Sequence, residues 1–427
     1  MDVDFGEVAG ETVLALTELE TPTYLYDLAA VRRAHGQLVR SLPDSAGLLY
    51  SLKANPHPAV LAQLAALGCD AEVSSPGELD AAIQAGFPSG RILYTGPGKR
   101  DEDVLRALSA GVRRFSVDSP YALAQLDRFV RTEHGAVSAL LRVNPPVPPA
   151  DAGLAMTGGP SQFGADLSWV LAQPHLFESR EHVELAGLHL YMGSNLTREE
   201  ALLAVFRYGL EVLEQVEKVM GRRLPVVDLG GGFGAPYAVH GELPRFDSLK
   251  SRLSALLEEN LPDWPGGERR IVFESGRYLT AGCGSLLTRV LDVKRSHGRR
   301  VVVLDAGVNH LGGMSGLGAE DPIEPQFRVG AEPGEPAGRV RAVAQEKPER
   351  TIVAGPLCHP LDVWTRDGCL PDVSVGDIVT VSNVGAYGLH SALALFHCHP
   401  MPLEVVVDGG REVDRSRAFL DRGRSER

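Results

Sequence analysis

Several features that mark common protein classes are scarce or absent in this sequence. No apolar stretch approaches the ~18 residues that cross a membrane as a helix. Residues 1–20 are acidic and lack the charged-then-apolar pattern of a secretory signal. Positive charge is in deficit, because 42 Lys and Arg stand against 55 Asp and Glu, and the formal net charge is −13. A chain without a basic stripe is a poor ligand for nucleic-acid phosphates. We therefore expect a soluble protein that binds neither nucleic acid nor a membrane.

Cysteine is also sparse and scattered. The five cysteines are Cys69, Cys283, Cys358, Cys369 and Cys398, and no two of them form a C-x-x-C pair. An odd, dispersed set predicts neither a disulfide framework nor a zinc site. Free cysteines fit a reducing compartment, so we expect a cytoplasmic protein without a bound metal.

The chain does contain a recurring pattern of short apolar runs, and most of them are followed by an amphipathic stretch. The runs fall at residues 47–54, 71–75, 91–96, 114–118, 138–144, 186–192, 225–230 and 270–275. Helices are predicted between them, for example at 58–67, 76–86, 101–110 and 197–220. Eight strand–helix units over this length predict a (β/α)8 barrel of the TIM type. A doubly wound parallel sheet is the alternative that the pattern alone leaves open.

The texture of the sequence changes after the eighth run. Gly and Pro punctuate short strand-like segments, with no long helix between them, at 285–294, 300–305, 340–346, 350–354, 377–382 and 402–407. This pattern predicts a C-terminal β-sandwich or β-barrel domain. The predicted organisation is an N-terminal segment at 1–28 that joins the β domain, a barrel at 29–280, the β domain at 281–410, and a charged, fraying tail at 411–427.

The predicted barrel places its chemistry at the carboxyl ends of its strands, where such barrels keep their active sites. The residues at or just after these ends are Lys53, Glu72, Ser74, Arg142, His189, Tyr191, Ser194, Asp228, Glu274, Gly276 and Arg277. The loops after strands seven and eight are the usual phosphate site. Here they carry Gly230–Gly232 and a Gly-Arg pair, which suit a phosphate because backbone N–H groups can approach its oxygens. A simple tight turn is the other interpretation of the three glycines.

Lys53 lies in an otherwise apolar strand. A lysine at a strand end can extend its amine to solvent without any function. Opposite a phosphate site in a closed barrel, however, a role as the nucleophile that forms a Schiff base is favoured.

These residues stand in motifs that resemble the alanine-racemase-like, fold-type-III pyridoxal-phosphate enzymes, and most closely the diaminopimelate and ornithine decarboxylases. The motifs run through the chain in the family's order: YSLKAN (50–55), EVSSPGEL (72–79), TGPGK (95–99), RVNP (142–145), QFG (162–164), GLHLYMGSN (187–195), DLGGGFG (228–234), ESGRYL (274–279), LDAG (304–307), GPLC (355–358) and GAYG (385–388). The resemblance implies an enzyme that decarboxylates an amino acid with pyridoxal 5'-phosphate as cofactor.

The resemblance also implies roles for individual residues. Lys53 matches the lysine that holds the cofactor as a Schiff base. Glu274 matches the acid that faces the pyridine nitrogen, where racemases of this fold have an arginine, so Glu274 favours decarboxylation. Glu72 and Glu78 match acids near the Schiff base. The matches to phosphate ligands are Ser194, Gly231, Gly232, Gly276, Arg277 and Tyr387. Arg142, His189 and Ser275 complete the expected cofactor-binding set.

Cys358 matches a cysteine that reaches the active site from the partner subunit and protonates Cα after carbon dioxide has left. The resemblance therefore implies a homodimer with two shared sites. Without the surrounding GPLC motif, a buried structural cysteine would be the preferred interpretation of this residue.

The sequence departs from the family pattern at three places. Tyr191 stands where a histidine often stacks on the cofactor ring. His359 stands where the diamine enzymes have an acid that helps to hold a substrate ammonium. No arginine occurs between Gly307 and Gln326, where diaminopimelate decarboxylases have one that binds a substrate carboxylate. These departures disfavour free diamino acids, because a buried charge would lack its partner.

The local motifs instead resemble a divergent branch that includes the butirosin-pathway decarboxylase of glutamyl-loaded carrier protein. The implied substrate is an amino acid with a conjugated side chain, which a carrier protein can hold. Arg100, Arg113 and Arg114 are candidates for a basic patch that would receive an acidic carrier, although a solvated charged face is the favoured interpretation of these three residues. Tyr191 and His359 can assist the proton transfer from Cys358. The alternatives are a diaminopimelate-type decarboxylase, an amino-acid racemase or epimerase, and a non-catalytic carrier of the cofactor.

Overall fold

The structure is a computed structural model, which describes residues 20–130, 135–146, 154–155, 157–262, 264, 266–267, 269–313, 326–329, 350–370 and 372–420. The chain divides into two compact units. One unit comprises Arg32–Ala235 and Leu243–Leu279. The other comprises the described part of Met1–Val31, the short segment Pro236–Glu242, and the described residues from Thr280 onward. No helix of the described residues is long and apolar enough to span a bilayer.

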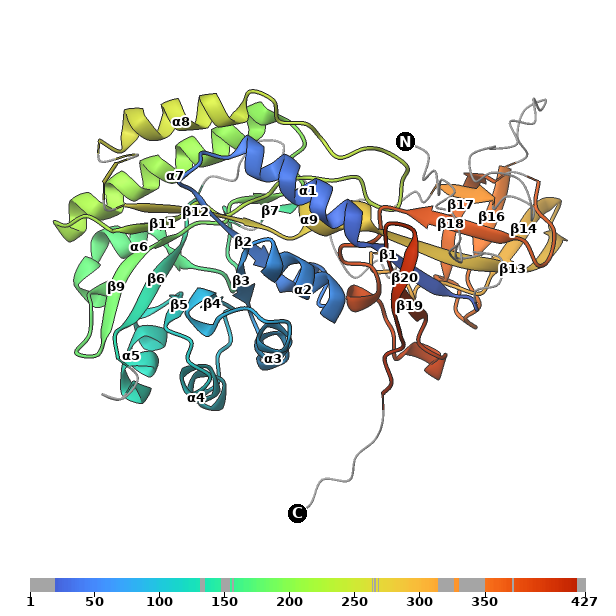
Figure 1. Cartoon of the computed structure of the whole chain (residues 1–427), viewed down its shortest axis with the longest axis horizontal. Coiled ribbons are helices and arrows are strands. Elements are labelled where there is room, and N and C mark those ends of the chain that lie inside the picture. The colour runs from blue at the N-terminus through green and yellow to red at the C-terminus, as the bar shows by residue number, and fades with distance from the viewer. Residues whose placement is uncertain are drawn as a thin grey trace, which may run out of the picture. The chain divides into compact units, whose positions relative to one another are not determined.

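The first unit is a closed barrel of eight parallel strands (Figure 1). In chain order the strands are β2 (Gly47–Ser51), β3 (Asp70–Val73), β4 (Ile92–Tyr94), β5 (Arg114–Val117), β6 (Val137–Asn144), β9 (Val183–His189), β11 (Val226–Asp228) and β12 (Arg270–Ser275). Strand β12 pairs with β2, and β5 pairs with β6, so the ring closes. All eight predicted strands are present, and closure excludes the doubly wound alternative.

Helices follow most of the barrel strands (Figure 1). Their bounds are α1 (Leu28–Ser41), α2 (Pro58–Ala66), α3 (Pro76–Gln84), α4 (Asp101–Ser109), α5 (Pro120–Phe129), α6 (Leu167–Ala172), α7 (Glu199–Met220), α8 (Leu249–Asn260) and α9 (Arg277–Thr280). Two of them start in the same way, with a Ser-Pro pair. The hydroxyls of Ser75 and Ser119 accept the N–H of the residue three further on, and the proline takes the first helical position. These caps set where the chain turns back from the carboxyl ends of β3 and β5.

The amino-terminal part of the barrel interior is apolar. Leu49, Leu93 and Leu140 pack with Val226 and Val272 in one layer. The first four of these side chains come from alternate strands of the ring (β2, β4, β6 and β11), the arrangement that fills TIM-type barrels. Polar groups are therefore left to the opposite, carboxyl end.

The second unit is built on a nine-stranded mixed sheet (Figure 1). Its strands are β1 (Thr23–Asp27), β13 (Gly284–Ser296), β14 (Arg299–Leu304), β15 (Phe327–Val329), β16 (Arg350–Ala354), β17 (Val363–Cys369), β18 (Ile378–Ser382), β19 (Leu403–Asp408) and β20 (Arg411–Ser416). The early strand β1 pairs with β13 and β19, so residues 23–27 are part of this sheet. Leu287, Ile378, Leu403, Val405 and Val407 form a core cluster of this unit.

The charged stretch after residue 410 differs from its prediction. Arg411–Ser416 does not fray but forms β20, paired antiparallel with β19. Between the two strands, Gly409 and Gly410 both have positive φ, the backbone that a two-residue hairpin turn requires. Charged side chains on β20 suit an edge strand. The strand predicted at 340–346 lies outside the described residues.

Candidate active site

Lys53 stands at the carboxyl end of the first barrel strand, in a short 3-10 turn (Leu52–Ala54). Its side chain is 40% exposed, so the amine is accessible from outside the protein. The Lys53 Nζ lies 3.7 Å from a carboxylate oxygen of Glu72 and 5.7 Å from the ring centroid of Tyr191. The structure thus brings together three of the predicted site residues from β2, β3 and the segment after β9.

Glu72 is held by its neighbours at the end of β3. Its other carboxylate oxygen accepts a hydrogen bond from the Thr95 hydroxyl at the end of β4. Glu78 lies close by, and its carboxylate accepts from the Ser74 amide at 2.6 Å and the Ser74 hydroxyl at 2.9 Å. Burial raises the pKa of Glu78, and the Ser74 hydrogen bonds oppose that rise. The two acids therefore form one ordered group beside the lysine.

His189 and Glu274 form a fully buried pair at the ends of β9 and β12. Nε2 of His189 lies 3.2 Å from the Glu274 carboxylate, and Nδ1 lies 2.8 Å from the Ser116 hydroxyl on β5. Burial by itself would raise the pKa of Glu274, but the adjacent His189 outweighs it and, with Lys53 and Arg142, lowers the pKa to about 2. Glu274 is therefore ionised at neutral pH.

The glycines of the two predicted phosphate loops lie where no side chain would fit. A Cβ on Gly231 would fall on the backbone carbonyl of Glu274, and a Cβ on Gly276 would lie 2.8 Å from that of Ala54. Gly232 has a φ of +88°, and a Cβ there would lie 2.6 Å from the carbonyl oxygen of Gly193. Because of these close approaches, the glycine loops sit against β12 and against the turn that carries Lys53.

The arrangement fits pyridoxal phosphate on an observation independent of the glycines. Four buried side-chain atoms at the carboxyl ends of the strands have no hydrogen-bond partner among the described residues. They are Glu72 Oε2, Ser275 Oγ, and the two facing atoms His189 Nε2 and Glu274 Oε1, whose 3.2 Å contact lacks hydrogen-bond geometry. Buried polar atoms are normally satisfied, and the cofactor carries a ring nitrogen, a hydroxyl and a phosphate that can satisfy them. Ser194 on the short strand β10 (Gly193–Ser194) and Arg277, the first residue of α9, belong to the same end of the barrel.

Arg142 is also part of this end of the barrel. It lies near the carboxyl end of β6 and is 9% exposed. Its guanidinium is 4.8 Å from the Phe163 ring centroid. Lys99, from the TGPGK motif, has its amine near Asp118 and Arg142; burial lowers the Lys99 pKa to about 8, Asp118 opposes this and Arg142 adds to it. Arg142 thus contributes positive charge near Glu274, and Lys99 interacts with Asp118 and Arg142.

Three predicted site residues belong to the β unit. Cys358 is exposed, and it precedes His359 in a loop that Asp362 holds in place. The Asp362 carboxylate, 2% exposed, accepts the amides of Leu357 at 2.7 Å and Val308 at 2.8 Å. Tyr387 has a φ of +56°, and its carbonyl accepts the hydroxyl of Tyr237 at 2.9 Å. The roles of Cys358, His359 and Tyr387 stay predictions.

The sequence does not identify two residues of the barrel cluster, and for a third it gives the position but no role. Ser116 and Thr95 bind His189 and Glu72, but a small hydroxyl at a strand end carries no distinctive sequence signal. Asp228 stands at a predicted strand end, yet no role follows from the sequence. In the structure its carboxylate lies with His189 and Glu274 in a group whose ligand-type atoms are within 4.8 Å of one another.

The three arginines that are candidates for a basic patch do not lie together. Arg100 starts α4, on the carboxyl side of β4, and pairs with Asp103 at 2.9 Å. Arg114 starts β5, at the opposite end of the barrel, and pairs with Asp70 at 3.1 Å, while its neighbour Arg113 donates to the carbonyls of Leu108 and Val112. These three arginines therefore do not make one patch, because Arg100 precedes α4 at the carboxyl end of the barrel and Arg114 starts β5 at the other end.

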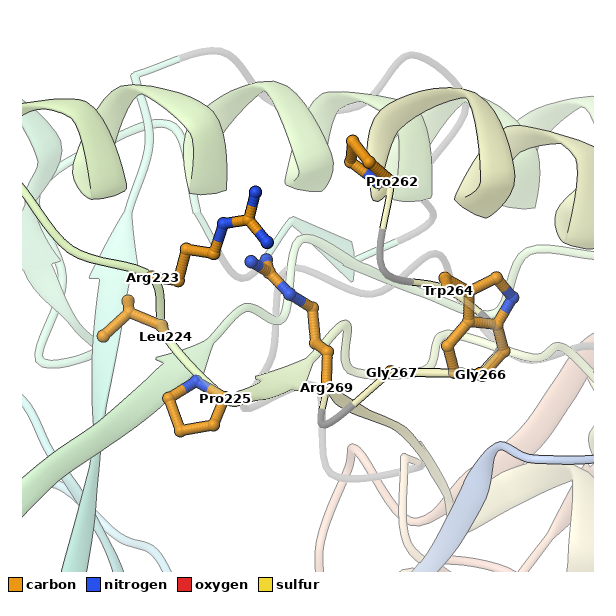
Figure 2. A pocket seen from close by; sticks show the side chains of 8 residues that line it. All are labelled: Arg223, Leu224, Pro225, Pro262, Trp264, Gly266, Gly267 and Arg269. Atoms are coloured by element: carbon orange, nitrogen blue, oxygen red, sulfur yellow. The ribbon is translucent and has the colours of Figure 1, made fainter.

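A pocket of about 680 Å³ lies away from this chemistry. Figure 2 shows Arg223 and Arg269 in it, beside Pro225 and Trp264. Pro225 and Arg269 directly precede β11 and β12, so the pocket is at the amino-terminal end of the barrel. Arg269 is already paired with Glu217 at 3.1 Å. The pocket is therefore not the reaction site.

Comparison with known proteins identifies the family of this chain. The family model described as "Pyridoxal-dependent decarboxylase, pyridoxal binding domain" matches residues 28–281. The chain is 30% identical over 425 residues to the L-glutamyl-[BtrI acyl-carrier protein] decarboxylase of Niallia circulans, covering 99% of this chain and 96% of that protein. It is 31% identical over 400 residues to the diaminopimelate decarboxylase of Methanothermobacter thermautotrophicus, covering 92% and 88%. The crystal structure of Helicobacter pylori diaminopimelate decarboxylase complexed with L-lysine shares the fold, with a TM-score of 0.78, 24% identity, and coverage of 94% and 95%.

A closed barrel with a separate β domain, and an accessible lysine beside buried acids, define an amino-acid decarboxylase that uses pyridoxal phosphate. The chain belongs to the pyridoxal-dependent decarboxylase family. It is a carboxy-lyase, and family membership favours decarboxylation over racemisation and over a non-catalytic cofactor carrier.

Proposed function

We propose that this enzyme removes the α-carboxylate of an amino acid whose side chain is conjugated, with a carrier-tethered amino acid as the first candidate. Support comes from the 30% identity, over 99% of the chain, to a decarboxylase that acts on a glutamyl-loaded carrier protein. The observation that carries the substrate class is the loop of His359. Nδ1 of His359 accepts the Leu361 amide at 3.2 Å, so the neutral ring keeps its proton on Nε2 and is a donor.

A donor at this position suits a different substrate group from the one an acid would hold. A carboxylate would attract a free ammonium, whereas an imidazole N–H suits the carbonyl of an amide or thioester. The absence of arginine between Gly307 and Gln326 agrees, because a second free carboxylate would lack a counter-charge.

The residues of the barrel divide the work of the reaction. When bound, pyridoxal phosphate supplies an electron-withdrawing ring that stabilises the negative charge left at Cα as carbon dioxide departs. Lys53 Nζ holds the cofactor, and Glu72 stays beside that amine. Glu274 keeps a proton on the ring nitrogen. Ser194, the glycine loops, Arg277 and Tyr387 bind the phosphate.

Cα must then receive a proton, and the donor in this proposal is the thiol of Cys358. Its loop comes from a second copy of the chain, so the working enzyme is a homodimer with two shared sites. The exposure of Cys358, and the clamp of Asp362 on its loop, support a thiol that acts outside its own unit. Tyr191 and His359 can assist. A cytoplasmic location stays a prediction from the scattered cysteines.

Mass spectrometry of the products tests the substrate class. The enzyme is incubated separately with glutamate, ornithine, lysine, diaminopimelate and glutamyl-loaded carrier protein, and each reaction is scored for loss of carbon dioxide. We expect turnover of the loaded carrier protein. Faster turnover of free diaminopimelate would support the second candidate, which the 31% identity to a diaminopimelate decarboxylase favours.

A pair of variants tests the role of His359. His359→Glu restores an acid and is expected to raise kcat/KM for free diamino acids relative to the conjugate, while His359→Gln keeps a neutral donor and is expected to leave the preference in place. Equal preferences in both variants would remove His359 from substrate recognition.

A further inference from the structure

Asp228 is a fully buried carboxylic acid that the roles above leave unused. It ends β11, and its side chain is 0% exposed. One oxygen, Oδ1, accepts the Gly230 amide at 2.9 Å. The other, Oδ2, has no hydrogen-bond partner among the described residues. An unpaired, ionised oxygen in this position would be costly, so the charge state of Asp228 needs an explanation.

Charged groups from several strands face Asp228, but none of them donates a hydrogen bond to its free oxygen among the described residues. Glu274 on β12 and Glu72 on β3 are acidic, whereas Arg142 on β6 and Lys53 after β2 are basic. His189 on β9 completes the surroundings, with its two ring nitrogens facing Ser116 and Glu274. Its ring nitrogens are engaged there and not with Asp228, so ionised Asp228 would place a second buried negative charge beside Glu274 with no hydrogen-bond donor on Oδ2 among the described residues.

We propose that Asp228 keeps its proton at neutral pH, and that this neutral acid is a positioning residue for Glu274. The inference rests on the proposed role of Glu274 at the cofactor ring. Neutral Asp228 removes a repelling charge from a cluster in which one ligand-type atom each of His189, Asp228 and Glu274 lies within 4.8 Å of the others. Glu274 then remains the one ionised acid of the pair, which is the state needed opposite a protonated ring nitrogen.

The electrostatics of the pair point the same way. Burial raises the pKa of Asp228 well above its usual value, and the negative charge of Glu274 adds to the rise. The opposite direction holds for Glu274, because His189 outweighs the effect of burial. When the pKa values of two neighbouring carboxyl groups shift in opposite directions, one group stays protonated and the other stays ionised.

Infrared spectroscopy of the cofactor-loaded enzyme at pH 8 tests the proposal directly. A protonated carboxylic acid has a carbonyl band separate from the bands of carboxylates. We expect such a band in the wild type, and we expect it to shift when the protein is labelled with carbon-13 in aspartate side chains. Glutamate labelling identifies any contribution from Glu404, whose pKa burial raises to about 7. If aspartate labelling shifts only carboxylate bands, the proposal is wrong.

Variants give a second test and a matched control. Asp228→Asn is expected to abolish the acid band, while Glu274→Gln removes a carboxylate band and leaves the acid band. Asp228→Asn keeps a neutral acceptor and donor, so it should bind pyridoxal phosphate about tenfold more tightly than Asp228→Ala, which leaves the Gly230 amide unpaired. Equal affinities of the two variants would count against a positioning role.

Two further outcomes are distinguishable. Because His189, Asp228 and Glu274 are also metal-ligand types, a stoichiometric divalent ion found by elemental analysis of the enzyme would overturn the proposal, since both acids would then be ionised. The infrared band does not depend on which substrate is turned over. Failure of the conjugated-substrate proposal therefore leaves this test intact, and failure of this test leaves the substrate assignment intact.

Discussion

The buried carboxylates at the two ends of the barrel differ in how completely they are hydrogen-bonded. At the amino-terminal end, Asp70 is 4% exposed and pairs with three arginines, Arg91 at 2.6 Å, Arg114 at 3.1 Å and Arg270 at 2.8 Å. At the carboxyl end, Glu72 Oε2 lies 3.7 Å from Lys53 Nζ and Glu274 Oε1 lies 3.2 Å from His189 Nε2, but neither oxygen accepts a hydrogen bond from a described residue. Buried carboxylate oxygens whose hydrogen bonds are all made stabilise the amino-terminal end of the barrel. Buried carboxylate oxygens without a hydrogen bond are typical of the carboxyl end, where barrels of this type bind their ligands.

The largest expected effect is the loss of decarboxylation when the lysine at the carboxyl end is replaced. Lys53→Ala removes the nucleophilic amine, so decarboxylation should fall by at least about 10³-fold. Reduction of the wild type with borohydride should fix the cofactor to residue 53, as read by peptide mass spectrometry. Lys250→Ala is the control, because Lys250 is a half-exposed lysine that pairs with Asp44 on the surface. A cofactor found on another lysine would contradict the site.

The next largest effect concerns the acid at the same end. Glu274→Gln should lower kcat by roughly 10²-fold, the usual loss when one preorganised charge is removed from a reaction centre. The cofactor should still be retained on Lys53, because the covalent bond does not involve Glu274. Rapid-quench and absorption measurements on the purified variant check both points. Unchanged kcat would remove Glu274 from the reaction.

At the amino-terminal end the expected loss is of stability. Asp70→Ala leaves three guanidinium groups without their shared acceptor and should lower the free energy of unfolding by about 3 kcal/mol, most of it from the least exposed one, Arg114. Urea denaturation measures this. Asp80→Ala, which removes a largely exposed partner of Arg106, should change stability little. Similar losses in the two variants would show that burial of Asp70 is not the cause.

The smallest expected effect concerns a buried acid with a neutral partner. Glu404 in the β unit is hydrogen-bonded to the Tyr26 hydroxyl at 3.1 Å, and burial raises the Glu404 pKa to about 7. Because the folded pKa lies above the unfolded one, the wild type loses stability as the pH rises from about 4.5 to about 7. Glu404→Gln should remove roughly 2 kcal/mol of that dependence.

Thermal or urea denaturation between pH 5 and pH 8 measures this last effect. The variant should gain on the wild type as the pH rises. Parallel pH profiles for wild type and variant would show that Glu404 is ionised in the folded protein at all of these pH values.

Much of the fold follows from local patterns. Apolar runs such as 270–275 coincide with β12, and Ser-Pro pairs mark the starts of α3 and α5. The hairpin of β19 and β20 was equally local, since Asp408-Gly409-Gly410-Arg411 carries the turn glycines. The prediction of a fraying tail rests on the charged residues of this stretch. The two turn glycines predict a hairpin instead, and the structure has that hairpin.

The candidate site is predicted less evenly. Lys53, Glu72, His189 and Glu274 follow from the rule that barrel strands end at the active site. Ser116 and Thr95 do not, because hydroxyl residues are common and their partners, His189 and Glu72, are 73 and 23 residues away in the chain. The arginine patch fails for the same reason, since neighbours in sequence can occupy opposite ends of the barrel.

The sequence by itself determined the order of strands and helices, the glycine loops, the lysine, and the family to which they belong, because each of these is a local pattern of size, polarity and backbone freedom. Only the tertiary structure decided which buried acids share an environment. Asp228 and Glu274 have the same chemistry and stand at equivalent strand ends. Their pKa values move in opposite directions because His189 faces Glu274, and that contact exists only once the ring of strands has closed.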